Sequence, residues 1–199
     1  MQISHNEKIA DTTGVLLVGG KSGRMGRDKA SIELSGRTLF SLALEFLRQH
    51  FVTVIIAGDR PDLAQVDIPS IPDLYPGSAL GGLHAGLSAA VTDWVFVMPC
   101  DMPYPDAKLL MLLYDLCEGV DAVVPRTPAG YEPVFAFYHK RCLPVFDDAL
   151  EQGRKSIFAL YPQLNVRFLE WQNMPRAWQK SLTNINTPED LLKIKGDIK

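Results

Sequence analysis

A glycine-rich, cationic segment begins at residue 19, directly after a short apolar run. Residues 19–29 contain four glycines and four Lys or Arg side chains. Glycines let backbone N–H groups turn toward a phosphate without side-chain interference, and Arg24 and Lys29 can neutralise phosphate oxygens. The pattern predicts phosphoryl-transfer chemistry. The alternative is a mobile surface loop whose charges are solvated, as expected here for Lys21 and Arg27.

Two familiar phosphate-binding motifs are not met in this segment. A Walker A loop would need glycine at position 15 ahead of Gly20-Lys21-Ser22, where the chain has Val15. Gly20, Gly23 and Gly26 are each three residues apart, which does not fit G-x-G-x-x-G. The sequence therefore does not favour a P-loop NTPase or a dinucleotide-dependent dehydrogenase.

A second candidate, Asp101, follows the apolar run 94–98 and precedes Met102-Pro103. Magnesium is commonly bound by one or two carboxylates together with substrate phosphate oxygens and water. One well-placed aspartate could therefore serve as the protein ligand of a Mg²⁺ site. The alternative is that Asp101 caps a helix beginning near Pro105.

Strands and helices must alternate to bring these two loops together. The alternation predicts a single open, doubly wound, mostly parallel α/β sheet with helices on both faces, which binds its ligand beyond the carboxyl ends of the strands. Residues 165–169 are expected to be less regular. Strands are expected at 14–18, 51–57, 94–98, 122–124 and 134–138, and helices at about 39–47, 83–90, 105–117, 142–150 and 189–194.

Length and composition limit the class of protein. The 199 residues, 47% hydrophobic, suit one domain over 14–199 after a polar tail at 1–13. A net charge of −3 argues against bulk nucleic acid as a partner, and no run of 18 apolar residues predicts a membrane span. The three cysteines form no C-x-x-C pair, so we expect reduced thiols in the cytoplasm, without disulfides or structural zinc.

The segment 17–30, L-V-G-G-K-S-G-R-M-G-R-D-K-A, resembles the signature of the bacterial MobA-type molybdenum cofactor guanylyltransferases. The resemblance continues through Asp73, 80–83, 99–103, 132–133 and 184–191. It implies one nucleotide-binding α/β domain, Rossmann-like and similar to nucleotide-diphospho-sugar transferases. It also implies GTP and Mg²⁺ as reactants and molybdopterin as the acceptor.

The resemblance implies roles for individual residues. Arg24, Lys29 and Asp101 would be catalytic, with Arg24 on the α- and β-phosphates, Lys29 on the phosphates and Asp101 on the metal. Asp73 would contact the nucleotide, although it could be an ordinary turn residue. The implied nucleotide-binding set is Leu17, Val18, Gly19, Gly20, Ser22, Gly23, Arg24, Lys29, Asp73, Gly82 and Asp101.

On the acceptor side the resemblance points to Glu132, Asn184 and Asn186. Asn186 could point toward the metal or the pterin phosphate, whereas Thr187 and Pro188 are explained by a helix start. The chain departs from the family pattern in two places: S-A-L-G-G at 78–82 replaces G-P-L-[AG]-G, and A-G-D at 57–59 lacks the usual asparagine. Because the first glycine and the proline are replaced, this loop is expected to be less rigid than in the family. The contact that the family's asparagine makes with the nucleotide is not assigned to any residue of this chain. His84, His139 and Cys100 are expected to be structural.

The expected reaction is transfer of GMP from GTP to the phosphate of molybdopterin, with release of pyrophosphate. The alternatives are CTP-dependent cytidylyl transfer to molybdopterin, nucleotidyl transfer to a sugar phosphate, and a catalytically silent nucleotide-binding adaptor. The protein is expected to be a monomer or weak oligomer and to bind neither nucleic acid nor membrane. Transient contact with cofactor-insertion proteins or apo-molybdoenzymes is also expected.

Overall fold

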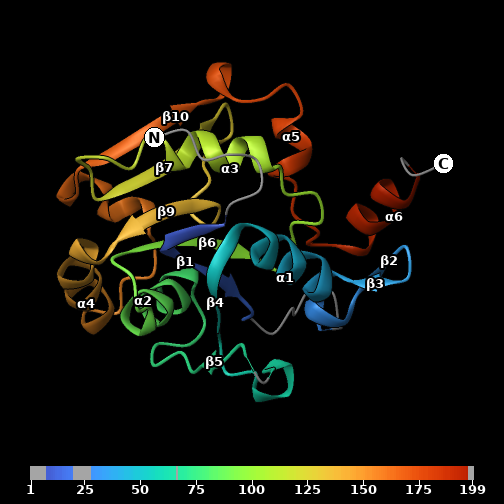
Figure 1. Cartoon of the computed structure of the whole chain (residues 1–199), viewed down its shortest axis with the longest axis horizontal. Coiled ribbons are helices and arrows are strands. Elements are labelled where there is room, and N and C mark those ends of the chain that lie inside the picture. The colour runs from blue at the N-terminus through green and yellow to red at the C-terminus, as the bar shows by residue number, and fades with distance from the viewer. Residues whose placement is uncertain (1–7, 20–27, 66, 197–199) are drawn as a thin grey trace.

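The computed structural model describes residues 8–19, 28–65 and 67–196, and Figure 1 shows their arrangement. The strands are β1 Ile9–Leu17, β2 Glu33–Leu34, β3 Arg37–Thr38, β4 Phe51–Ala57, β5 Ser70–Ile71, β6 Trp94–Pro99, β7 Ala122–Thr127, β8 Gly130–Tyr131, β9 Ala136–His139 and β10 Val166–Glu170. The α-helices are α1 Leu39–His50, α2 Ala79–Ala89, α3 Ala107–Tyr114, α4 Leu143–Glu151, α5 Trp178–Ser181 and α6 Pro188–Gly196.

The central sheet has the strand order β10-β7-β9-β6-β1-β4-β5, and β8 pairs with β7. The pairs β1–β4, β1–β6, β4–β5 and β7–β10 are parallel. Strand β9 is antiparallel to both β6 and β7 and joins the two parallel halves. The predicted mostly parallel α/β sheet is confirmed.

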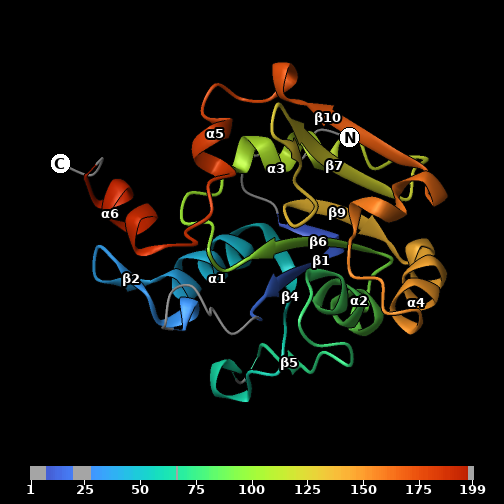
Figure 2. The ribbon, with the colours of Figure 1, turned by 180° about the vertical axis from the view of Figure 1, so that it is seen from behind.

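Helices cover both faces of the sheet, as expected for a doubly wound fold (Figures 1 and 2). One buried cluster contains the apolar sides of α1 and α3, and a second contains those of α2 and α4. Phe96 on β6 is fully buried, and its ring lies 4.9 Å from that of Phe135. Over the three described ranges, the helices are all too short or too polar to cross a membrane.

The predicted β-α-β unit formed by β1, α1 and β4 is confirmed. Helix α1 starts where the Thr38 hydroxyl accepts a hydrogen bond from the Ser41 amide, at 3.1 Å. Its buried residues follow helical spacing, so that one face packs against the sheet. The helix ends at His50, and the β-branched run from Phe51 continues as β4.

Strand β1 begins earlier than expected, within the segment interpreted as a polar tail. Ile9 pairs with Phe51, and Thr13 pairs with both Thr53 and Val95. Thr13 is fully buried and its hydroxyl lies 2.7 Å from the hydroxyl of Thr92. Because a hydroxyl with a hydrogen-bond partner can be buried at little cost, a polar sequence could extend into the core here.

Several other boundaries also differ from the prediction. Helix α2 starts at Ala79, because the Ser78 hydroxyl caps it, and α3 starts at Ala107, because Asp106 caps it, and ends at Tyr114. The predicted strand at 134–138 starts two residues later, at β9. Residues 166–170 form edge strand β10 instead of an irregular segment, because they pair in parallel with β7.

A small third cluster lies at one end of the molecule. The hairpin β2–β3 turns through Ser35 and Gly36, whose φ values are +53° and +77°. Ile32 and Leu34 of this region pack with Leu39 and with Ile185 and Ile194 from the C-terminal part. Figures 1 and 2 both show the hairpin close to α6. This packing places the residues near position 186 next to the segment 32–39.

Candidate active site

Three predicted site residues from distant parts of the sequence meet in one cluster. The Lys29 ammonium donates to Asp101 Oδ2 at 2.7 Å and to Asn186 Oδ1 at 2.6 Å. Lys29 starts a 3₁₀ turn after the glycine-rich segment, Asp101 follows β6, and Asn186 precedes α6. Because β1 and β6 are parallel neighbours, their carboxyl ends place these loops side by side.

Asp101 has one oxygen that is not used by the fold. The residue is buried, and its Oδ1 atom has no hydrogen-bond partner within the part of the chain that the structure describes. The alternative helix-capping role is wrong, because Asp106 caps α3 through Lys108 N at 2.6 Å. An orphaned, buried carboxylate oxygen is costly unless a ligand satisfies it, and an oxygen donor of this kind suits Mg²⁺.

The neighbourhood of Asp101 limits the kind of metal site that fits. Among residues 8–19, 28–65 and 67–196, no three His, Cys, Asp or Glu side chains are grouped so that they could hold an ion. Magnesium suits such a site, because it is commonly bound through one or two carboxylates plus substrate phosphates and water.

The C-terminal part of the cluster is fixed by main-chain hydrogen bonds. The Ile185 amide donates to the Asp101 carbonyl at 2.9 Å, and Ile185 is fully buried. Asp190 Oδ2 accepts from the amides of Asn186 and Thr187, and the Thr187 hydroxyl accepts from Asp190 N. The hydrogen bond from the Asn186 amide is the main cause that lowers the pKa of Asp190. This reciprocal cap confirms the predicted helix start and holds Asn186 beside Lys29.

The end of β1 supplies the backbone implied for nucleotide binding. Leu17 and Val18 are buried, Gly19 is exposed, and the Val18 amide donates to the Ala57 carbonyl at 3.0 Å. A Cβ at Gly82 on α2 would lie 3.2 Å from Leu17 Cδ2. A residue with a Cβ at position 82 would require the Leu17 side chain to shift by a few tenths of an ångström.

Asp73 lies against the first turn of α2. Its Oδ1 accepts from the Tyr75 amide at 2.8 Å, so the side chain stabilises a turn, and its contact with the nucleotide stays a prediction. A Cβ at Gly81 would lie 2.6 Å and 2.8 Å from the two Asp73 carboxylate oxygens and 2.2 Å from the Tyr75 carbonyl oxygen. Only glycine fits at position 81, so α2 starts close to the Asp73 carboxylate.

The rest of the predicted set is divided between described and undescribed positions. Glu132 and Asn184 are both half-buried, Glu132 between β8 and β9 and Asn184 next to the buried Ile185. The catalytic candidate Arg24 and the nucleotide-binding candidates Gly20, Ser22 and Gly23 lie outside the described residues, as do Lys21 and Arg27.

Sequence reasoning gave no role to Asp28 and Arg60, which support the turn that carries Lys29. Asp28 Oδ1 accepts from the Ala30 amide at 3.1 Å and caps the turn. Arg60 bridges Asp28, at 2.8 Å, and Asp62, at 2.7 Å. An aspartate directly before a helical turn is a capping signal that could have identified Asp28. The contact with Arg60, which is 32 positions away, has no local signal.

The histidines and cysteines expected to be structural are placed accordingly. His84 on α2 lies 2.7 Å from Asp147 on α4, and His139 ends β9 and accepts from the Arg141 amide. Cys100, Cys117 and Cys142 are free and buried, and burial raises the pKa of each thiol to about 12. These thiols are suited to packing and not to nucleophilic chemistry.

We therefore expect all three thiols to resist a disulfide reagent in the folded protein. At about pH 8 a free thiol is partly ionised, whereas burial keeps these thiols protonated and inaccessible. The absorbance of the released thiolate should show no fast labelling of the folded protein. Three thiols per chain should react once guanidinium chloride unfolds it. Fast labelling of even one thiol without denaturant would contradict this assignment.

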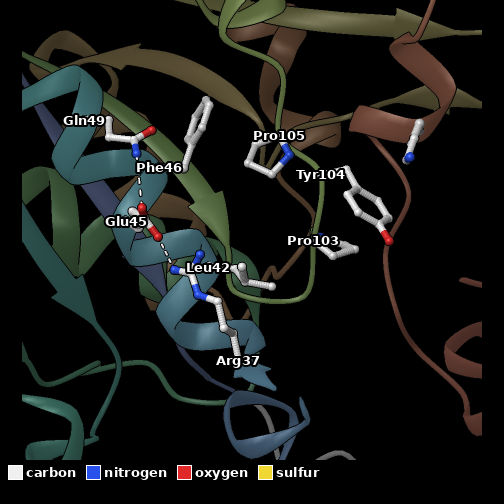
Figure 3. Close-up of a pocket in the computed structure, with 9 residues that line it drawn as sticks. Arg37, Leu42, Glu45, Phe46, Gln49, Pro103, Tyr104 and Pro105 are labelled. Carbon is white, nitrogen blue, oxygen red and sulfur yellow. Dashed lines mark hydrogen bonds and ion pairs between the residues drawn. The ribbon is translucent and has the colours of Figure 1, made fainter. Parts of the chain in front are cut away.

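Two hollows adjoin this edge of the sheet. The larger, of about 440 Å³, lies beside α1 (Figure 3), where Arg37 pairs with Glu45 and the Lys180 ammonium lies 4.2 Å from the centre of the Tyr104 ring. The smaller, of about 280 Å³, lies beside the start of α2 and contains Arg154 and Lys155. Neither hollow is lined by Lys29, Asp101 or Asn186, so the cluster is separate from both.

A cation and a buried carboxylate meet beyond the ends of two parallel strands of an α/β sheet, which is where such folds bind their ligands. The class of protein, a nucleotidyltransferase, is given by comparison with known families. A model of the MobA-like NTP transferase domain matches residues 14–166. The chain belongs to this family.

Relatives and solved structures agree with this assignment. The chain is 35% identical over 185 residues to the molybdenum cofactor guanylyltransferase of Vibrio atlanticus (strain LGP32), covering 90% of this chain and 93% of the relative. The probable molybdenum cofactor guanylyltransferase of Pelotomaculum thermopropionicum is 32% identical, with 94% and 93% covered.

Among solved structures, molybdopterin-guanine dinucleotide biosynthesis protein A from Archaeoglobus fulgidus has a TM-score of 0.82 at 27% identity, with 94% of this chain and 98% of that chain covered. The 2-C-methyl-D-erythritol 4-phosphate cytidylyltransferase from Thermus thermophilus has a TM-score of 0.64 at 16% identity, over 92% of this chain and 97% of that one. The second likeness concerns the fold alone.

Proposed function

We propose that this chain transfers GMP from GTP to the phosphate of molybdopterin, releasing pyrophosphate and forming a guanine dinucleotide. The observation that carries the chemistry is the meeting of Lys29 and Asp101 at the ends of two parallel strands, with one Asp101 oxygen orphaned. The substrates are supported by the relatives named molybdenum cofactor guanylyltransferase, to which the chain is similar over 90% of its length or more.

In this reaction the acceptor is a phosphate monoester whose oxygen is anionic at neutral pH, so little or no general base is needed. In-line attack forms a bond between that oxygen and the α-phosphorus of GTP and breaks the bond to the oxygen that leaves with pyrophosphate. The work of the protein is alignment and charge neutralisation. The absence of a catalytic base from the proposed set agrees with this.

The roles proposed for the residues are those that the family resemblance implies. The backbone of 17–19, together with Asp73 and Gly82, would hold the nucleotide, and Lys29 would neutralise its phosphates. Arg24 would fork across the α- and β-phosphate oxygens. Asp101 would hold Mg²⁺, which would neutralise phosphate charge and orient the reacting groups when bound.

The acceptor would lie on the side of Glu132, Asn184 and Asn186. We place the reaction in the cytoplasm, where the free thiols would stay reduced. Transient contact with cofactor-insertion proteins or apo-molybdoenzymes is part of the same proposal, because the dinucleotide must pass to an enzyme that uses it.

The experiment is pyrophosphate release by purified protein with molybdopterin, comparing GTP with CTP, each with magnesium and with excess EDTA. Release that needs GTP, molybdopterin and magnesium together is expected. A preference for CTP would assign the chain to cytidylyl transfer instead. Turnover only with a sugar phosphate would replace the acceptor, and nucleotide binding without any turnover would point to an adaptor.

A further inference from the structure

Glu132 lies on the same rim of the sheet as Asp101, but on the other side from the nucleotide-binding set. Its amide donates to the Pro125 carbonyl on β7, and its carbonyl accepts from Phe135 just before β9. Strand β9 pairs with β6, whose carboxyl end leads to Asp101. The strands follow one another in the order β7-β9-β6-β1-β4-β5. Glu132 therefore lies on one side of β6. Leu17, Val18 and Asp73, which lie at or near β1 and β5, are on the other side.

The Glu132 carboxylate has no hydrogen-bonding or ion-pairing partner among the residues that the structure describes. The residue is half-buried. Burial alone raises its pKa. In contrast, Asp73 accepts a hydrogen bond from the Tyr75 amide, and Asp101 accepts one from the Lys29 ammonium. A partly desolvated carboxylate without donors gains more than an exposed one from a ligand that supplies them.

Both reactants of the proposed function offer the matching donors. Guanine and pterin each contain a 2-aminopyrimidin-4-one ring, in which a ring N–H and an amino N–H point the same way. One carboxylate can accept from both. The preceding residue, Tyr131, is exposed, and its ring lies 5.3 Å from that of Tyr161 and 4.9 Å from that of Phe168, so three aromatic rings gather near this part of the chain. Aromatic rings suit a flat heterocycle.

We propose that Glu132 recognises the 2-aminopyrimidin-4-one edge of the pterin and so selects the acceptor. This inference rests on the proposed function. The pterin is favoured over guanine because Glu132 lies beyond β6, away from the nucleotide-binding set. Glu132 acts as a specificity residue and takes no part in bond making.

The test compares the wild type with Glu132→Gln and Glu132→Ala, and uses Glu118→Gln at an exposed position as the matched control. Steady-state pyrophosphate release gives KM for molybdopterin and for GTP. The rate ratio between GTP and ITP, which lacks the 2-amino group, reports on guanine recognition. Quenching of tryptophan fluorescence gives Kd for molybdopterin without requiring turnover.

We expect both Glu132 variants to raise KM and Kd for molybdopterin by about 10- to 100-fold, because two charge-assisted hydrogen bonds are lost. KM for GTP and the GTP/ITP ratio should match those of the wild type and of Glu118→Gln. A collapse of the GTP/ITP ratio with unchanged molybdopterin affinity would assign Glu132 to guanine and overturn the inference. Unchanged values throughout would overturn it as well.

Failure of the proposed function gives a different result. A wild type that releases no pyrophosphate from GTP with molybdopterin would contradict the function. The fluorescence titration would still decide the inference: a weaker Kd in the Glu132 variants would support it, and an equal Kd would overturn it.

Discussion

Asp101→Asn is expected to lower kcat for GMP transfer by about a thousandfold or more, because a metal and phosphate site loses its only proposed carboxylate. The amide retains the size of the side chain and one oxygen that can accept from Lys29, so the loop should stay in place. The melting temperature should change little, because the loss of the ion pair with Lys29 offsets the gain from removing an orphaned, buried charged oxygen. Pyrophosphate release and thermal unfolding, measured on the same sample, test both parts.

Asp106→Asn is the matched control for this prediction. It makes the same chemical change five positions later, where asparagine caps a helix as well as aspartate does. Activity close to that of the wild type is expected. If Asp101→Asn kept more than about a tenth of the wild-type kcat with magnesium, Asp101 would not be the metal-binding residue.

Gly58→Ala is expected to lower the free energy of unfolding by about 3 to 5 kcal/mol, through backbone strain combined with a steric clash. Gly58 has φ of +142°, and a Cβ there would lie 2.0 Å from the Val18 carbonyl oxygen. Neither strand can shift easily, because the Gly58 amide donates to Ile71 O and the Val18 amide donates to Ala57 O. Urea unfolding monitored by circular dichroism gives the stability change.

Gly119→Ala separates the two causes. Its φ of +74° is also positive, but nothing lies within 4 Å of the new Cβ. The expected loss is about 1 kcal/mol, the cost of a left-handed backbone conformation alone. Equal losses in the two variants would show that the contact with Val18 has no effect on stability.

Glu132→Gln is expected to stabilise the fold at neutral pH, although it weakens the proposed acceptor site. Burial raises the pKa of Glu132, so the ionised form is disfavoured in the folded state. The protonated carboxyl contributes to the stability of the folded state below the unfolded-state pKa of about 4.3. This contribution is lost as the pH rises through the folded-state pKa. The amide carries no charge at either pH.

The melting temperature of Glu132→Gln relative to the wild type should therefore be higher at pH 7 and should converge with it toward about pH 4. Scanning fluorimetry across this range measures the difference, with Glu118→Gln as the exposed control. A variant that is less stable than the wild type at pH 7 would contradict the proposed cost of burying this carboxylate.

The elements next to the site were predictable where one local signal was sufficient. Continuous apolar runs indicated β4 and β6, and their parallel pairing with β1 places the following loops at one edge. Helical spacing indicated α1, and Thr187-Pro188 indicated the start of α6. The positions of Lys29 and Asp101 after strand ends followed from the same patterns.

Other features depend on partners that are distant in sequence. Thr12 and Thr13 of β1 are polar but buried, because they pair with the neighbouring strands and the Thr13 hydroxyl meets that of Thr92. Strand β10 has the mixed burial of an edge strand, and its pairing with β7 identifies it. The sequence analysis considered only Asp101 as the cap of α3, and the hydrogen bond from Lys108 N shows that Asp106 has this role. No local pattern could place Asn186 on Lys29.

The contact between Lys29 and Asn186 also has a consequence for the time at which the protein becomes competent during its synthesis. The two residues are 157 positions apart, whereas β1, α1 and β4 are contiguous and can form as soon as they have emerged. The cluster cannot exist until residue 186 has been added. A nascent chain can therefore build most of its sheet before the proposed site is complete, and the site is completed only when residue 186 joins it.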